Sequence, residues 1–216
     1  MSREHGDATS LHGIGVAPGT GRTVRLCRVV SPALVLGSTQ PLEDVDHSAA
    51  VRNGYHVVRR HSGGGAVLVE PDAVVWVDVV IPRSDPLWED DVGRAFSWLG
   101  QAWAAALVEV GLLEAEVHRG GLVASRWSSK VCFAGLGPGE VTSGGRKVVG
   151  MAQRRTRHGA LFQCAVPREW RPERLLDVLV VSPRERATAA ELDDWVRPVP
   201  EASVADLEAA LVGQLP

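Results

Sequence analysis

The sequence predicts an α/β protein of the α+β kind, with one mixed β-sheet and flanking helices. Two observations lead to this fold class. Strand-like runs rich in β-branched residues follow one another through most of the chain, and only residues 85–111 carry a long helical period. A doubly wound parallel sheet needs a helix after nearly every strand, so the few helices and the hairpin-rich middle favour a mixed sheet.

The first half of the chain predicts four strands and one long helix. The strands are expected at residues 24–30, 33–37, 55–60 and 73–81. The last of them is apolar enough to be a buried strand. Asp85 followed by Pro86 is a typical helix start, and apolar residues then recur every three or four positions as far as Val110. Gly111 is a suitable stop for this helix.

The second half predicts shorter elements. Strands are expected at residues 115–123, 130–134, 147–152 and 159–166, and a short helix at 173–178. Thr188 and Glu191 have the spacing of a capping box, and residues 203–211 are weakly amphipathic. The chain is therefore expected to finish with a pair of short helices.

Residues 1–22 predict a loosely ordered lead-in, because they are rich in glycine, serine, threonine and histidine and show little periodicity. Residues 23–216 predict a single domain with short C-terminal helices. Only about forty residues follow Val180, so no large accessory domain is expected there.

Composition excludes several classes of protein. The chain of 216 residues is 45% apolar and 23% charged with a net charge of −3, which disfavours binding to nucleic acid. It has no run of eighteen apolar residues and no apolar leader, so we expect a cytoplasmic protein without membrane contact. Its three cysteines suit a reducing compartment and match neither a disulfide framework nor a metal site.

Two motifs carry the chemistry. The first, Arg59 to Val67, reads Arg-Arg-His-Ser-Gly-Gly-Gly-Ala-Val, and its glycines can bring bare backbone N–H groups close to a ligand. The second, Gly144 to Arg155, places the single Lys147 between glycine-rich and arginine-rich flanks. A backbone cradle and one fixed cation together point to a phosphate or an activated acyl carbonyl as the ligand.

These motifs, in this order, resemble the lipoate–protein ligase and octanoyltransferase family, whose catalytic fold is shared with biotin–protein ligases. The resemblance covers roughly residues 24–180. It implies Lys147 as the catalytic cation. It further implies that the acyl or adenylate ligand contacts Arg60, Gly63, Gly64, Gly65, Ala66, Val67, Leu68, Gly150 and Ala152.

The resemblance implies attachment of lipoate or octanoate to one lysine of a carrier domain, such as a 2-oxoacid dehydrogenase acyltransferase subunit or the glycine-cleavage H protein. The first hypothesis is a ligase that uses ATP and magnesium to form an acyl-adenylate. The alternative is transfer from acyl carrier protein through a thioester on Cys132, without ATP. Cys132 precedes Phe133 and lies fifteen positions before Lys147, as the nucleophile does in the transferase branch.

A third hypothesis is a catalytically quiet acyl or adenylate binder that serves a separate ligase subunit. It rests on departures from the family pattern. The histidine and asparagine that usually follow the glycine loop are absent from residues 68–73, and Gln163-Cys164-Ala165 replaces the usual Gln-His-Gly. The helix that normally precedes the first strand and walls the acyl pocket is not recognisable in residues 1–22.

Overall fold

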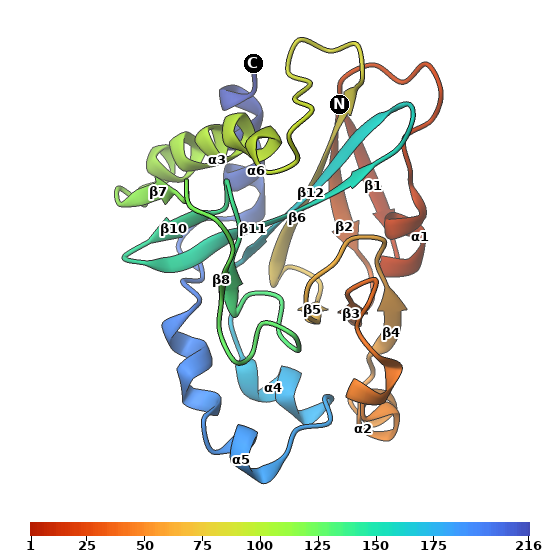
Figure 1. Ribbon diagram of the computed structural model, residues 1–216, viewed down its shortest axis with the longest axis vertical. Coiled ribbons are helices and arrows are strands. Elements are labelled where there is room, and N and C mark those ends of the chain that lie inside the picture. The colour runs from red at the N-terminus through yellow and green to blue at the C-terminus, as the bar shows by residue number, and fades with distance from the viewer.

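The computed structural model describes residues 1–216 and is built on a seven-stranded sheet with the order β1-β2-β6-β12-β11-β10-β7 (Figure 1). Only β1 and β2 pair in parallel; the remaining neighbours are antiparallel. The strands of this sheet are β1 (Ser2–Gly6), β2 (Thr23–Val29), β6 (Val74–Pro82), β7 (Ala115–Val117), β10 (Val141–Ser143), β11 (Arg146–Arg155) and β12 (Gly159–Pro167). The predicted mixed sheet is confirmed.

Two helices, α3 (Ser97–Glu109) and α6 (Val204–Gln214), pack side by side on one face of this sheet. Strand residues alternate between the two faces, so every second side chain of β6 and β12 points toward these helices. Those side chains form the largest core of the molecule together with the buried residues of α3 and α6.

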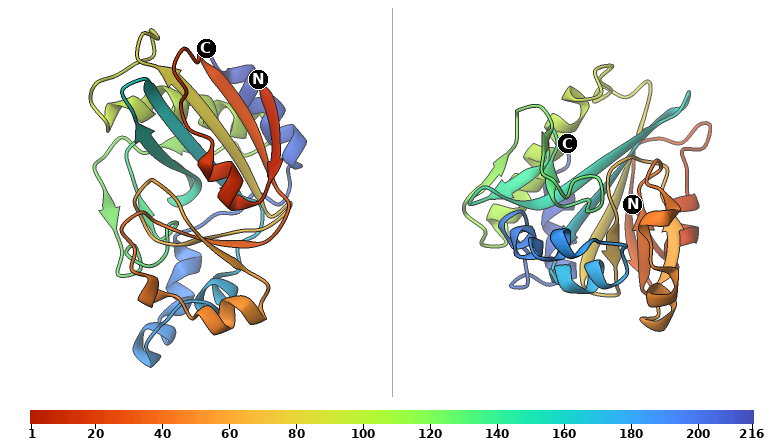
Figure 2. Two further views of the ribbon diagram at one scale, coloured as in Figure 1. Left: turned by 90° about the vertical axis from the view of Figure 1, so that its right-hand side faces the viewer. Right: turned by 60° about the horizontal axis from the view of Figure 1, so that its bottom comes forward.

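Smaller elements complete the fold, and most of them lie below the large sheet in Figure 1 and in the left view of Figure 2. A three-stranded sheet has the order β4-β3-β5, and a short pair joins β8 to β9. These strands are β3 (Ala33–Leu36), β4 (His56–Arg59), β5 (Val67–Val69), β8 (Val123–Ala124) and β9 (Gly135–Leu136). The short helices are α1 (Ala8–Gly13), α2 (His47–Arg52), α4 (Pro172–Asp177) and α5 (Pro183–Arg186), with 3₁₀ turns η1 (Leu42–Asp44), η2 (Arg94–Phe96) and η3 (Ala189–Asp194).

The expected loose lead-in is wrong for most of its length. Strand β1 pairs with β2 along its whole length, and α1 follows directly. Asp7 caps this helix by accepting a 2.7 Å hydrogen bond from the Ser10 amide, and Leu11 is only 1% exposed. A helix of six residues is too short to show a helical period in the sequence, which is why it was not recognised.

Three further expectations need correction. The long helix begins at Ser97 rather than after Asp85, because the Asp85 carboxylate accepts from the Leu87 amide in a turn and binds Arg22. The predicted strand at 130–134 is instead a tight turn with a single bridge at Val131. Capping boxes are formed by Ser182 and Glu185 at the start of α5 and by Ser203 and Asp206 at the start of α6, not by Thr188 and Glu191.

Helices of this structure are all too short or too polar to cross a membrane.

Candidate functional site

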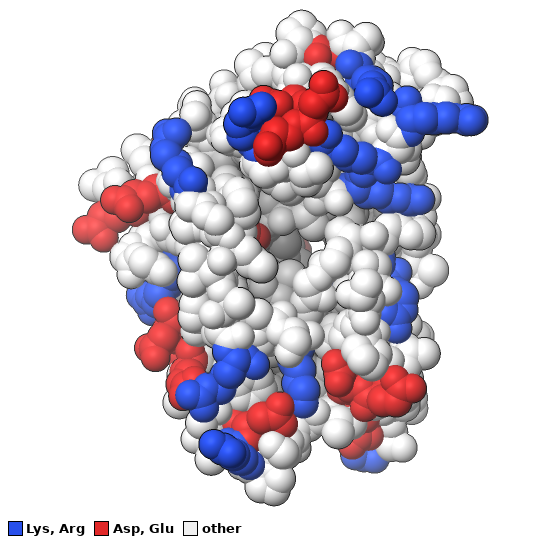
Figure 3. Space-filling view, in the orientation of Figure 1, with Lys and Arg blue, Asp and Glu red and all other residues white.

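A cavity of about 340 Å³ lies between strands β6, β11 and β12 of the large sheet and the loops at 60–64 and 128–137. This volume is within the usual range of small-molecule sites, and most of the lining is apolar. Figure 3 shows a hollow in the middle of one face of the molecule; most of the charged side chains on this face lie around it, and a small acidic surface is visible inside it.

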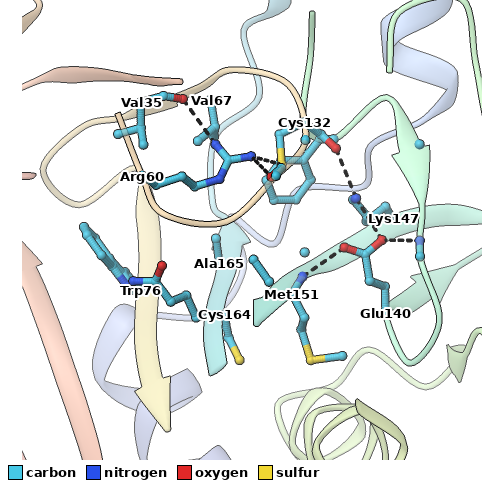
Figure 4. Close-up of a pocket in the computed structure, with 18 of the residues that line it drawn as sticks. Val35, Arg60, Val67, Trp76, Cys132, Glu140, Lys147, Met151, Cys164 and Ala165 are labelled. Carbon is cyan, nitrogen blue, oxygen red and sulfur yellow. Dashed lines mark hydrogen bonds and ion pairs between the residues drawn. The ribbon is translucent and has the colours of Figure 1, made fainter. Parts of the chain in front are cut away.

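Most of the predicted site residues meet at this cavity. Those that line it are Arg60, Gly63, Gly64, Val67, Cys132, Lys147, Gly150 and Ala152. Residues from three separate parts of the sequence are therefore brought to one place, as the close-up in Figure 4 shows for several of them.

Three predicted ligand contacts lie outside the lining: Gly65, Ala66 and Leu68. Ala66 donates a 2.8 Å hydrogen bond from its amide to the carbonyl of Lys130 and accepts one of 2.9 Å from the Cys132 amide. A Cβ atom on Gly65 would lie 2.4 Å from a backbone nitrogen of that same segment. We propose that Gly65 and Ala66 hold the Cys132 turn in place rather than contact ligand.

The glycine loop needs glycine at Gly64, whose φ of +95° is a conformation that other residues rarely adopt. Its carbonyl also packs against Gly37, where a Cβ atom would lie 1.8 Å from the Gly64 oxygen. The amides of Gly63 and Gly64 donate no hydrogen bond within the protein. Both residues line the cavity, so we propose that these amides bind an oxygen of the ligand.

Lys147 is buried at 3% exposure and its ammonium is held in three ways. It lies 2.9 Å from a carboxylate oxygen of Glu140, donates 3.2 Å to the carbonyl of Cys132, and lies over the ring of Phe133 at 5.1 Å. Glu140 in turn accepts from the amides of Gly137 and Met151. The lysine is thus fixed by a charge pair that is itself fixed by backbone.

Cys132 is half-buried, and its Sγ lies 3.5 Å from the guanidinium of Arg60. It lies on a turn and not on the strand predicted at 130–134, so its side chain is not packed between neighbours on a sheet. The other two cysteines are buried. Burial raises the pKa of the Cys27 thiol, and it raises that of Cys164 to about 12.

The side of the cavity formed by the large sheet carries polar groups that were not predicted from the sequence. The Trp76 indole donates 2.7 Å to the carboxylate of Asp78, and the Gln163 amide nitrogen lies 3.4 Å from the same oxygen and 3.3 Å from His12. The His12 and Trp76 rings are 4.4 Å apart. A carboxylate inside an apolar strand was the signal for Asp78, whereas nothing in the sequence singled out Glu140 or His12.

Burial controls the ionisation of this group. It raises the pKa of Asp78 to about 6, although hydrogen bonds from Trp76 and Gln163 act in the other direction. It lowers the pKa of His12 to about 4, with help from the charge of Arg60. Near pH 7, His12 is therefore neutral.

Comparison with known proteins identifies the family of this chain. A model of the lipoyl protein ligase A/B catalytic domain matches residues 16–215. The chain belongs to this family. The resemblance inferred from the two motifs is therefore confirmed.

Curated relatives include the octanoyltransferase LipM of Moorella thermoacetica, 34% identical over 139 residues, and that of Kyrpidia tusciae, 32% identical over 163 residues. These alignments cover 63% and 73% of the chain and 50% and 58% of the relatives. The chain thus spans little more than half the length of the relatives it matches.

Solved structures agree on the fold. A bipartite lipoate protein ligase from Thermoplasma acidophilum superposes with a TM-score of 0.72 at 20% identity, covering 99% of this chain and 82% of the other. A lipoate-protein ligase A bound with ATP gives 0.71 at 20% identity, covering 99% and 84%. The predicted lipoate-ligase fold is confirmed.

Proposed function

We propose that the chain transfers an octanoyl-type acyl group from a thioester donor to a lysine of a carrier domain, through a thioester on Cys132. The observation that carries the proposal is the place of Cys132: a half-buried thiol on a turn that lines an apolar cavity next to Lys147. The octanoyltransferase names of the curated relatives support the same choice. The donor would be acyl carrier protein and the acceptor a lipoyl domain or the H protein.

The reaction has two steps. Cys132 attacks the donor carbonyl as a thiolate, the bond between that carbonyl and the donor sulfur breaks, and the departing thiolate takes up a proton. The acceptor lysine then attacks the new thioester as a free amine. An amide forms, the bond to Cys132 breaks, and the proton lost by the amine restores the thiol.

Lys147 suits the negative charge that develops on the acyl oxygen. An ammonium has three hydrogens, and Lys147 uses two of them for Glu140 and for the carbonyl of Cys132. One hydrogen remains for a ligand in the cavity. Together with the free amides of Gly63 and Gly64 it would form an oxyanion site, and losing one such donor typically costs about 100- to 1000-fold in rate.

ATP-dependent ligation, the first hypothesis from the sequence, has less support. The free amides of the glycine loop could receive a phosphate, and a ligase with this fold is known with ATP bound. Magnesium, however, prefers carboxylate oxygens, and Glu140 is the one carboxylate that lines the cavity. Both of its oxygens are already bonded. The residues at the cavity therefore do not fit a protein-held magnesium ion.

The test is intact-mass analysis after incubation with octanoyl–acyl carrier protein in the absence of ATP. We expect a mass increase of one octanoyl group, located on Cys132, which is lost on addition of a lipoyl domain that becomes octanoylated. Cys132→Ser should give no adduct and no transfer. Cys27→Ala, which removes a buried thiol outside the cavity, is the matched control and should behave as the wild type.

Other outcomes would decide for the rival hypotheses. Modification of the lipoyl domain only when ATP and lipoate are added, and still by Cys132→Ser, would indicate a ligase. No modification with either substrate, although the protein is folded, would indicate the quiet binder.

A further inference from the structure

The two cations of the cavity have opposite electrostatic surroundings. Lys147 is neutralised by Glu140 at 2.9 Å. Arg60 is equally buried, at 5% exposure, yet none of the ion pairs within 4.0 Å in the protein involves it. Burying a charge without a counter-ion costs free energy. A buried arginine without an acidic partner is therefore well placed to stabilise a negative charge that forms during the reaction.

Backbone carbonyls fix the direction of the Arg60 guanidinium. One nitrogen, Nη1, donates 3.3 Å to the carbonyl of Val35, and the other, Nη2, donates 2.6 Å to Gly63 and 2.9 Å to Gly65. Nη2 also lies 3.5 Å from Sγ of Cys132 (Figure 4). Two hydrogens serve these three acceptors, so the link to sulfur is mainly one of charge.

Gly64 makes this approach possible. A Cβ atom at this position would lie 3.0 Å from Nη2 of Arg60 and 3.8 Å from Sγ of Cys132. The absence of a side chain lets the guanidinium and the sulfur face each other across the loop.

We propose that Arg60, and not Lys147, is the counter-ion of the Cys132 sulfur. The inference rests on the proposed function, in which negative charge appears on this sulfur twice, when it attacks the donor and when it leaves the acyl group. Arg60 favours both events, while Lys147 is directed to the acyl oxygen. The site thus divides two tasks between two cations.

Other charged groups near Cys132 do not compete for this task. Lys147 and Glu140 satisfy each other, and the lysine reaches the Cys132 carbonyl rather than its sulfur. Lys130, two residues away, donates to the carbonyl of Val180 and pairs with Glu185.

The experiment measures the alkylation rate of Cys132 by iodoacetamide, read by mass spectrometry of its peptide, from pH 6 to pH 10. It needs no acyl donor. Arg60→Met should lower the rate at pH 7 by about tenfold or more, because an opposite charge within about 4–6 Å favours the charged form. The difference should shrink toward pH 10, where thiols ionise without help, and Arg60→Lys should restore part of the rate.

Arg59→Gln is the matched control. Arg59 also binds loop carbonyls, those of Gly37, Ser38 and Gln40, but it is exposed and does not contact Cys132. The alkylation rate of Cys132 in Arg59→Gln should equal that of the wild type. A folded Arg60→Met protein with the wild-type rate at pH 7 would overturn the proposal.

A second variant decides the matter if Arg60→Met does not fold. Lys147→Met combined with Glu140→Gln removes the other cation without leaving its carboxylate unpaired. A tenfold lower alkylation rate in this variant, with Arg60 in place, would assign the counter-ion to Lys147 and refute the inference. Fast, Arg60-dependent alkylation without an octanoyl adduct would instead refute the proposed function and leave the role of Arg60 intact.

Discussion

Neighbouring residues of strands β6 and β12 point to two different faces of the sheet. One face is packed into the hydrophobic core, and the other borders the cavity. One face presents Val75, Val77 and Phe162 to α3 and α6, in a core that excludes water. The other presents Trp76 and Gln163 to the cavity, beside the buried Asp78. Successive side chains of a strand point to opposite faces of the sheet, so one strand can supply residues to both the core and the cavity.

This difference shows where the molecule obtains its stability. A cavity of about 340 Å³ forgoes the packing that would otherwise fill it, and buried polar groups add a desolvation cost. The core face must compensate for both. Substitutions on the core face are therefore expected to change stability alone, and substitutions on the cavity face to change chemistry and, at its buried polar groups, the pH dependence of stability.

The largest effect on stability is expected on the core face. Leu107→Ala removes a fully buried side chain of α3 and should lower the free energy of unfolding by about 2–5 kcal/mol, measured by urea denaturation. The alkylation rate of Cys132 in the folded fraction should stay within about twofold. A large loss of thiol reactivity with this variant would show that the two faces are coupled.

A smaller effect concerns the polar groups on the cavity face and depends on pH. The pKa of Asp78 is raised from 3.8 to about 6, so its contribution to stability is full below pH 3.8 and is lost as pH rises toward 6. The pKa of His12 is lowered from 6.5 to about 4, so its contribution is full above pH 6.5 and is lost as pH falls toward 4. Each is worth about 3 kcal/mol across its window.

These opposite slopes nearly cancel between pH 4 and pH 6 in the wild type. In Asp78→Asn only the contribution of His12 remains. The free energy of unfolding relative to the wild type should therefore increase by up to about 3 kcal/mol from pH 4 to pH 6. His12→Gln should do the reverse over the same range. Parallel curves for all three proteins in urea titrations would show that neither group titrates as its burial implies. Arg25 acts on Asp78, and Arg60 and His61 act on His12, and these three residues are the same in all the proteins compared.

The sequence predicted the core face far better than the cavity face. The apolar run of β6 and the helical period before Val110 depend on local repetition, and both identified core elements. Lys147 and the glycine loop were found through their motifs. Glu140 and His12 could not be found, because their role depends on a fold that brings residues 12, 140 and 147 to one cavity. The turn at Cys132 depends on Ala66, more than sixty residues earlier.

The last prediction compares the same change, alanine to leucine, made once on each face. On the cavity face it is expected to have the smallest effect on stability and the sharpest effect on chemistry. Ala152→Leu places a larger side chain in the cavity beside Gln163, where there is room, and should change the free energy of unfolding by less than about 1 kcal/mol. Ala106→Leu places the same group in the packed core under α3 and should cost about 1–3 kcal/mol through overpacking.

Acyl loading should respond in the opposite order. Ala152→Leu shortens the space available to an acyl chain, so we expect Cys132 to be loaded by acetyl but not by octanoyl carrier protein, as judged by intact mass. Ala106→Leu should still accept the octanoyl group in its folded fraction. If Ala152→Leu were loaded with octanoyl as fast as the wild type, the acyl chain would not occupy this cavity, and the division between a stabilising face and a reacting face would fail at its most direct point.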